Sequence, residues 1–168
     1  MTELNAQDLL KDLADNLHKH LTEHKISNPV FIGIQTGGVW VAKQLQDLLN
    51  NQDKLGVLDI AFYRDDFSRV GIQPTVKPSK LPLGVNDRHI VLVDDVLHTG
   101  RTLRAALNEI FDYGRPASVS LVVLVQRNGR ELPIQADVVA RTLTLDKAQH
   151  VQLSGPDPLE LKIINQNK

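Results

Sequence analysis

Short apolar runs that alternate with helical patterns constrain the fold of this chain more than any other feature. Residues 30–34, 89–93 and 119–125 are rich in Val, Ile and Leu, and each run has the length of a buried strand. After them, apolar residues recur at helical spacing over 39–49 and 102–113. Strands that alternate with helices predict right-handed crossovers and a mostly parallel α/β sheet flanked by helices on both faces.

The boundaries of several elements are marked by single residues. Asn5 is the expected N-cap of a first helix, and Asn28-Pro29 is expected to end it. Gly114 is expected to stop the helix at 102–113 in a left-handed cap. The other expected elements are, in order, a helix at 9–21, a strand within 55–63, a long polar loop at 64–83 and short strand-like pieces within 132–164, including 138–140 and 159–164.

The composition is that of an ordinary globular protein. The 168 residues, 42% of them hydrophobic, predict a single domain over 1–168. The lack of cysteine excludes disulfides and thiolate metal sites. No apolar run approaches the about 18 residues of a membrane span, and residues 1–10 lack a signal pattern, so we expect a cytoplasmic protein with no membrane partner. With a net charge of −1, RNA binding would require a local basic patch.

Residues 91–102, with the sequence VLVDDVLHTGRT, carry the strongest chemical signal. An apolar strand leads to the carboxylates of Asp94 and Asp95, and a loop with Thr99 and Gly100 then leads into a helix. Main-chain N–H groups at a helix start favour a phosphate, and a glycine lets the main chain approach it closely. Carboxylates can accept hydrogen bonds from sugar hydroxyls. Acids beside an anion site therefore favour a ribose phosphate.

Simpler interpretations exist for these segments. Paired acids followed by Thr-Gly also suit a plain turn with a capped helix, and Thr36-Gly37-Gly38 suits a plain turn between strand and helix. The full string at 91–102 is more specific, and it is not a Walker loop because the Gly-Lys-Ser/Thr ending is missing. His20 and His24 have the spacing of a metal pair, but an exposed helix face explains them better because no carboxylate completes a motif.

The string at 91–102 resembles the phosphoribosyl pyrophosphate signature of type I phosphoribosyltransferases. The strings YRDD at 63–66, GRP at 114–116 and RELPI at 130–134 are similar in order and spacing to one branch of this family, the pyrimidine-operon regulators with uracil phosphoribosyltransferase activity. This resemblance implies a five-stranded parallel core with a small hood. It also implies dependence on Mg²⁺ and the formation of UMP and pyrophosphate from uracil and phosphoribosyl pyrophosphate.

The same resemblance assigns roles to individual residues. It implies that Asp94 and Asp95 hold the ribose hydroxyls, partly through Mg²⁺, and that Arg64 neutralises the leaving pyrophosphate; these three are the expected catalytic residues. It places Arg127 and Arg130 near the base and the pyrophosphate, although a salt bridge to Glu131 explains Arg130 equally well. The expected pyrophosphate loop is Thr36, Gly37 and Gly38. The expected 5′-phosphate loop is Val96, Leu97, His98, Thr99, Gly100, Arg101 and Thr102.

Three positions depart from the family pattern. Relatives often have Asp where this chain has Gln126, and Arg where it has Gly37. Both positions are expected near the metal and the pyrophosphate, so their replacement predicts weaker catalysis without loss of binding. His98 stands where relatives often have Tyr; it can act as an acid or base near pH 7, or it is only a partly exposed loop residue.

Three functions fit these observations. The first is the uracil enzyme, the second is a UMP-sensing attenuator that binds an mRNA leader, and the third is a nucleotide-binding protein that has lost both catalysis and RNA binding. RNA binding needs a basic surface. The candidate basic residues are interleaved with acids, which predicts weak or absent binding: Lys11, Lys19, Lys25, Arg141 and Lys147. We expect a homodimer or a higher homo-oligomer.

Overall fold

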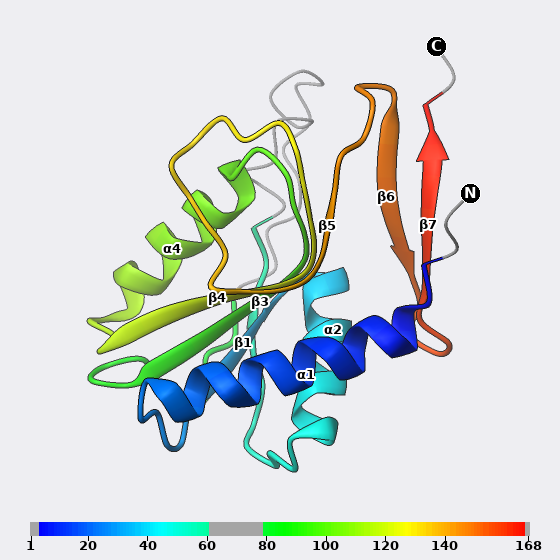
Figure 1. Cartoon of the computed structure of the whole chain (residues 1–168). Helices are drawn as coiled ribbons and strands as arrows, with labels where there is room; N and C mark the ends of the chain where they lie inside the picture. Colours follow the sequence, from blue (N-terminus) through cyan, green and yellow to red (C-terminus); the bar gives the residue numbers. More distant parts are fainter. Residues whose placement is uncertain (1–3, 61–78, 167–168) are drawn as a thin grey trace.

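The computed structural model describes residues 4–60 and 79–166 (Figure 1). The elements within them are α1 (Ala6–Glu23), β1 (Val30–Ile34), α2 (Gly37–Leu48), β2 (Gly56–Leu58), β3 (His89–Leu97), α4 (Arg101–Tyr113), β4 (Ser118–Arg127), β5 (Val138–Leu143), β6 (Gln149–Ser154) and β7 (Glu160–Asn165). None of the helices in this part of the chain is long and apolar enough to cross a membrane.

Five strands form one sheet in which every neighbouring pair runs parallel. Their order is β2-β1-β3-β4-β5. Helices α1 and α2 cover one face of this sheet, and α4 covers the other (Figure 1). The α/β fold with a mostly parallel sheet, which the alternation of strands and helices predicts, is therefore confirmed.

The side chains of β3 alternate between two hydrophobic cores. Val91 and Val93 belong to the core that includes α1 and α2, whereas Ile90 and Leu92 belong to the core that includes α4. This alternation follows from the two-residue period of a strand. Because both faces are buried, a slip by one residue would exchange the two sets of side chains, so the cores fix the register of β3. The acids that follow Val93 are thereby held at a defined place at the end of the sheet.

The predicted cap of α1 and the bounds of β1 are confirmed, whereas α1 ends at Glu23, before the predicted stop at Asn28-Pro29. Asn5 caps α1, because its Oδ1 accepts hydrogen bonds from the main-chain N–H groups of Gln7 and Asp8 at 2.9 and 3.1 Å. β1 has the predicted bounds. α2 begins at Gly37 rather than at Val39, so the predicted turn forms the first residues of the helix.

Two predictions about β3 and α4 are wrong. β3 continues to Leu97 instead of ending before Asp94, because β4 runs beside it and pairs Leu97 with Gln126. Gly114 does not adopt a left-handed cap, since its φ of 160° and ψ of −161° are extended. Glycine suits this position for another reason, because a Cβ there would overlap the side-chain oxygen of Asn86.

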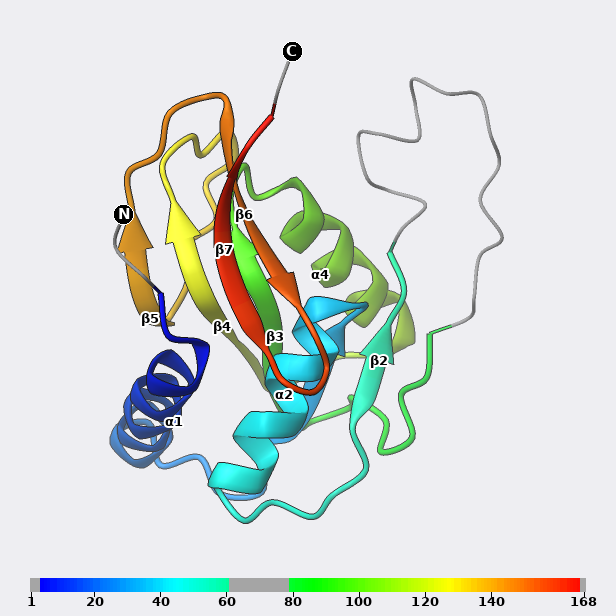
Figure 2. The same cartoon turned by 90° about the vertical axis from the view of Figure 1, so that its right-hand side faces the viewer.

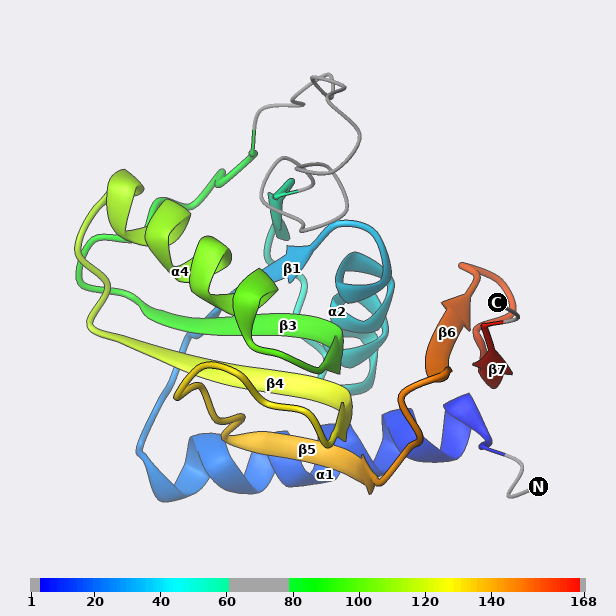
Figure 3. The same ribbon diagram turned by 90° about the horizontal axis from the view of Figure 1, so that it is seen from above.

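The last two strands, β6 and β7, form a separate antiparallel hairpin. Figure 3 shows this hairpin beyond the carboxyl ends of β3, β4 and β5, and Figure 2 shows it beside α2. Leu159 and Leu161 join the core that includes α1, and the Trp40 ring of α2 lies against Gly155. The hairpin matches the small hood that the family resemblance implies.

The predicted loop at 64–83 lies largely outside the described residues. In its described part, 79–83, Lys80 pairs with Val57 of β2 through main-chain hydrogen bonds of 2.7 and 2.8 Å. This pairing brings the chain back to the edge of the sheet before β3.

Candidate active site

Polar segments follow the carboxyl ends of three neighbouring strands. Residues 36–38 follow β1, residues 98–100 follow β3, and residues 128–131 follow β4. The carboxyl ends of parallel strands meet at one edge of a sheet, and ligands of such folds bind outside that edge. The sheet order β1-β3-β4 therefore places the β3 segment between the other two.

The turn after β1 touches the acids at the end of β3. A Cβ on Gly37 would lie 2.7 Å from Cγ of Asp95, and a Cβ on Gly38 would lie 3.1 Å from Cα of Asp94. Side chains at these positions would therefore collide with the acidic pair. The structure brings together the two segments that the sequence analysis assigned to one site.

Main-chain hydrogen bonds orient both carboxylates. Asp94 is 4% exposed, and its Oδ1 accepts a hydrogen bond from the N–H of Asp95 at 2.9 Å. Oδ1 of Asp95 accepts one from the N–H of Val96 at 3.0 Å. Oδ2 of Asp95 lies on the side of Gly37, where the turn comes close. Each carboxylate is therefore held by the main-chain N–H group of the next residue.

The acidic pair suits a magnesium ion that is shared with a substrate. Mg²⁺ is usually held by one or two carboxylates together with substrate phosphates and water. Within the described residues, no group of three or more His, Asp or Glu side chains could hold a metal ion by itself. Asp94 and Asp95 fit the carboxylate share of such a site.

The loop between β3 and α4 presents the open start of a helix. Gly100 is the N-cap of α4, with a φ of 95°, and it provides no side-chain cap. A positive φ of this size favours glycine. Oγ1 of Thr99 accepts a hydrogen bond from the N–H of Arg101 at 3.2 Å. The first-turn N–H groups and the helix dipole together favour an anion at this position.

Not every residue of this loop can meet a ligand with its side chain. Leu97 is fully buried in the core on the α4 side, so only its main chain is available. Val96 packs against the opposite core. Thr99 and Thr102 are half-buried and carry hydroxyl groups.

The segment after β4 supports this loop from the outside. The main-chain N–H groups of Glu131 and Leu132 donate to the carbonyl oxygen of Thr99 at 2.9 and 3.2 Å. The Arg130 guanidinium donates to the carbonyl oxygen of His98. Glu131 pairs with Arg101 at 2.8 Å, so the proposed ion pair between Arg130 and Glu131 is not the arrangement in this structure.

Arg127 connects the end of β4 with the start of β6. It is 6% exposed, and its guanidinium donates hydrogen bonds to the carbonyl oxygens of Asn128, Asp146 and Gln149. Among the described residues no carboxylate pairs with it. Three of its five N–H donors are thus directed to the main chain.

The contacts of Gln126 and Gly37, two residues that depart from the family pattern, show how each position is filled. Nε2 of Gln126 donates to Oγ1 of Thr142 at 3.0 Å, so this side chain points along the sheet toward β5. Gly37 has no room for a side chain unless Asp95 moves.

His98 belongs to the loop between β3 and α4, and its ring faces the segment that follows β4. Its Nε2 would be 2.9 Å from a Cβ on Gly129, which places the ring against that glycine. Partial burial lowers the pKa of His98, and the positive charges of Arg127, His150 and Arg130 lower this pKa further. The imidazole is therefore neutral near pH 7. Sequence reasoning missed His150 because it did not predict strand β6, and a single histidine forms no recognisable pattern.

Some candidate residues lie elsewhere. Arg64 and the rest of the string at 63–66 lie outside the described residues. Nε2 of His20 forms a hydrogen bond of 3.0 Å with Oγ of Ser120, near the amino end of β4 and so at the opposite edge of the sheet. The Trp40 ring packs against Gly155 of the β6–β7 hairpin and so takes no part in the site at the strand ends.

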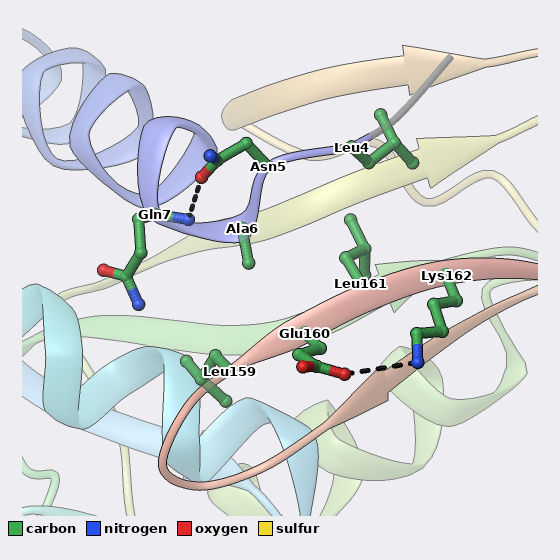
Figure 4. A pocket seen from close by; sticks show the side chains of 8 residues that line it. All are labelled: Leu4, Asn5, Ala6, Gln7, Leu159, Glu160, Leu161 and Lys162. Atoms are coloured by element: carbon green, nitrogen blue, oxygen red, sulfur yellow. Dashed lines mark hydrogen bonds and ion pairs between the residues drawn. The ribbon is translucent and has the colours of Figure 1, made fainter. Parts of the chain in front are cut away.

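A separate hollow lies between the start of α1 and β7 (Figure 4). Its lining residues are Leu4, Asn5, Ala6, Gln7, Leu159, Glu160, Leu161 and Lys162. The charged side chains of Glu160 and Lys162 pair with each other at 3.2 Å. None of the candidate residues lines this hollow, so the site at the strand ends is the better candidate.

Comparison with known families defines the class of this protein. A model of the phosphoribosyl transferase domain matches residues 1–156. The chain therefore belongs to the phosphoribosyltransferase family, as the string at 91–102 predicts.

Particular relatives narrow this assignment. The bifunctional protein PyrR of Nitrosococcus oceani is 60% identical over 162 residues, which cover 95% of this chain and 92% of that protein. PyrR of Pseudomonas syringae pv. tomato is 55% identical over 159 residues, which cover 95% and 94%. The predicted resemblance to this branch of the family is thus confirmed.

Solved structures support the fold. A hypoxanthine phosphoribosyltransferase from Staphylococcus aureus has a TM-score of 0.67 at 19% identity and covers 84% of this chain and 77% of its own. The Trypanosoma cruzi enzyme of the same name has a TM-score of 0.65 at 20% identity and covers 86% and 76%. At these identities the likeness concerns the fold alone.

Proposed function

We propose that this single-domain protein forms UMP and pyrophosphate from uracil and phosphoribosyl pyrophosphate, and that it regulates pyrimidine biosynthesis genes. The high identity to PyrR proteins over nearly the whole chain supports both activities. The observation that carries the catalytic part is the contact between the turn at Gly37 and the acid Asp95, beside the open start of α4. This arrangement provides sugar, pyrophosphate and phosphate sites in one row.

Binding and orientation account for most of the proposed mechanism. The base displaces pyrophosphate at the anomeric carbon of the ribose through a state with oxocarbenium character. Asp94 and Asp95 hold the ribose hydroxyls so that this carbon faces the base, and their negative charges stabilise the developing positive charge. A bound Mg²⁺ would neutralise the pyrophosphate, and the same two carboxylates would hold that ion.

The 5′-phosphate and the pyrophosphate of the substrate bind on opposite sides of the acidic pair. The loop of residues 96–102 holds the 5′-phosphate at the start of α4, through the main-chain N–H groups of residues 99–102 and the hydroxyls of Thr99 and Thr102. Main-chain N–H groups of Thr36, Gly37 and Gly38 hold the pyrophosphate. Arg64, outside the described residues, is the proposed cation that neutralises the leaving group.

The departures from the family pattern set an expectation for the rate. Gln126 carries no charge where relatives often have an acid, and Gly37 offers no guanidinium to the pyrophosphate. We therefore expect slower catalysis with retained binding of nucleotides.

Regulation through an mRNA leader is the second part of the proposal. The bifunctional relatives favour it. The charge pattern argues for weak RNA binding by the isolated chain. Nζ of Lys19 lies 3.9 Å from Oε1 of Glu23, and this negative charge partly cancels the attraction of the lysine for RNA phosphates. Assembly into a homodimer or a higher homo-oligomer would combine the basic residues of several copies. Such a protein would act in the cytoplasm.

A direct assay tests the catalytic part. Radiolabelled uracil, hypoxanthine and guanine are each incubated with phosphoribosyl pyrophosphate and Mg²⁺, and the nucleotides formed are separated. The proposal expects UMP to form fastest. Formation of a purine nucleotide alone would overturn the uracil assignment, and the absence of any product would leave the third function, nucleotide binding without catalysis.

A further inference from the structure

His150 of β6 carries a buried ring nitrogen that lacks a hydrogen-bond partner. Within residues 4–60 and 79–166, its Nε2 is the one buried side-chain nitrogen or oxygen atom that makes no hydrogen bond. Buried polar groups in native proteins are nearly always hydrogen-bonded, so an exception calls for a physical explanation. A ligand group that completes the hydrogen bond is one such explanation.

The surroundings of His150 belong to the candidate active site. Arg127 donates to the carbonyl oxygen of Gln149, the residue that precedes His150, and thereby fastens β6 to the end of β4. His98 lies against Gly129 in the segment that follows Arg127. Both histidines are therefore next to segments on the β4 side of the strand ends, His98 against Gly129 and His150 beside the residue that Arg127 holds.

The order of the strands indicates which part of a ligand reaches this place. The turn after β1 is the proposed pyrophosphate site, and the end of β3 with the start of α4 is the proposed ribose 5-phosphate site. β4 lies on the other side of β3 from β1. The nucleobase, the remaining part of the nucleotide, then extends toward the β4 side, where His98 and His150 lie.

The nearby side chains favour a ligand group that accepts hydrogen bonds. Arg127 and Arg130 both donate to main-chain carbonyl oxygens and keep their positive charges. Carbonyl oxygens of a nucleobase are acceptors, and uracil has two of them. An imidazole Nε2–H can donate to such an oxygen.

We propose that His150 contacts the ligand directly, with its Nε2–H donating to a carbonyl oxygen of the nucleobase, while Arg127 acts as the positioning residue that holds β6 in place. This proposal rests on the proposed function, because it uses the same orientation of the nucleotide in the site.

Calorimetric titration of the full chain with UMP, AMP, GMP, ribose 5-phosphate and pyrophosphate tests the proposal. The variants are His150→Phe, which keeps a ring but removes the donor, His150→Leu as a second donor-free variant, and His150→Gln, which keeps an N–H donor. Gln152→Ala is the matched control, because Gln152 is exposed and two residues further along β6.

The donor-free variants should bind UMP about tenfold more weakly, as expected for one lost hydrogen bond in a buried site. Their affinity for ribose 5-phosphate should stay unchanged, His150→Gln should recover most of the UMP affinity, and Gln152→Ala should bind as the wild type does. Unchanged UMP affinity, or an equal loss for ribose 5-phosphate, overturns the contact with the base.

The same titrations separate this proposal from the proposed function. A wild type that prefers GMP contradicts uracil as the substrate, and the role of His150 then stands if its donor-free variants lose that preference. A wild type that prefers AMP, whose base has no carbonyl oxygen, overturns the contact with a base carbonyl as well. A wild type that binds every nucleotide no more tightly than ribose 5-phosphate overturns both.

Discussion

The two sides of the candidate active site are built in different ways. The acidic side, formed by Gly37, Gly38, Asp94 and Asp95, depends on close main-chain approach, because its glycines leave no room for a Cβ. The cationic side, where Arg127 and Arg130 lie beside His98 and His150, depends on the two long arginine side chains that reach main-chain carbonyl oxygens. Close main-chain approach fixes the positions of the two carboxylates rigidly. The hydrogen bonds of the arginines, in contrast, can be removed one side chain at a time.

This difference has a chemical consequence. Carboxylates in fixed positions suit the sugar, whose hydroxyl groups must be held while the anomeric carbon reacts. Positive side chains that are bonded to carbonyl oxygens keep their charge and favour electron-rich groups of a ligand. Substitutions on the acidic side should therefore affect reaction and folding strongly, and those on the cationic side should act more gradually.

The largest effect is expected from Asp95→Asn. Removal of one charge beside the reacting carbon should lower turnover by about a hundredfold and weaken UMP binding at least about tenfold, or about 1.4 kcal/mol, with the fold intact. Steady-state kinetics and calorimetric titration measure the two changes. Asp112→Asn, an exposed acid on α4, is the control and should change neither. Wild-type UMP affinity in Asp95→Asn would remove the ribose assignment.

Gly38→Ala should have the next largest effect, this time on stability. Its Cβ would lie 2.5 Å from the carbonyl oxygen of Val93 and 3.1 Å from Cα of Asp94, and neither main-chain atom can move easily. We expect the free energy of unfolding to fall by about 1–3 kcal/mol, the usual cost of overpacking. Urea denaturation measures this loss.

Gly37→Ala provides the matched comparison. The three atoms nearest to its Cβ all belong to the side chain of Asp95, which can rotate away. It should therefore reduce stability less than Gly38→Ala while it still weakens UMP binding. Equal losses of stability would contradict the difference between the two contacts.

Arg127→Met tests the cationic side. The variant leaves carbonyl oxygens of Asp146 and Gln149 without their buried donor, which should cost about 1–2 kcal/mol of stability. Amide hydrogen exchange in β6 should become faster, because its fastening to β4 is lost. Arg130→Met removes a single hydrogen bond at a half-buried position and should change less. Unchanged exchange in β6 of Arg127→Met would refute the positioning role.

The smallest effect concerns the pH dependence of stability. The pKa of His98 is lowered in the folded state, mainly by burial, from its ordinary value of 6.5. Below pH 6.5 the unfolded chain therefore binds a proton more readily than the folded chain does, so stability falls with falling pH until the folded His98 also titrates. His98→Asn should lose slightly less stability than the wild type between pH 7 and 5. Denaturation midpoints at both pH values check the sign, and a greater loss in the variant would contradict it.

The sequence predicts the acidic side better than the cationic side, and the reason is physical. Asp94 and Asp95 lie in one continuous string with the loop, and Thr36 to Gly38 follow a strand that is recognisable by itself. The rule that parallel strand ends meet at one edge then brings both segments together. Main-chain carbonyl oxygens, the partners of Arg127, leave no trace in the sequence.

Some features of the fold could not be predicted from the sequence, because they too depend on contacts between residues distant in the chain. The full length of β3 depends on its pairing with β4, which no local pattern records. The need for glycine at position 114 comes from contact with Asn86, a residue distant in the chain, and not from a left-handed conformation. β6 became recognisable only through its partner β7, and with it the position of His150.

The position of UMP in a crystal structure of the complex tests the central claim most directly. The account predicts the phosphate on the main-chain N–H groups of residues 99–102, the ribose hydroxyls within hydrogen-bonding distance of Asp94 or Asp95, and the base on the side of His98 and His150. UMP bound in the hollow between α1 and β7, or bound with its base toward the turn after β1, would contradict it.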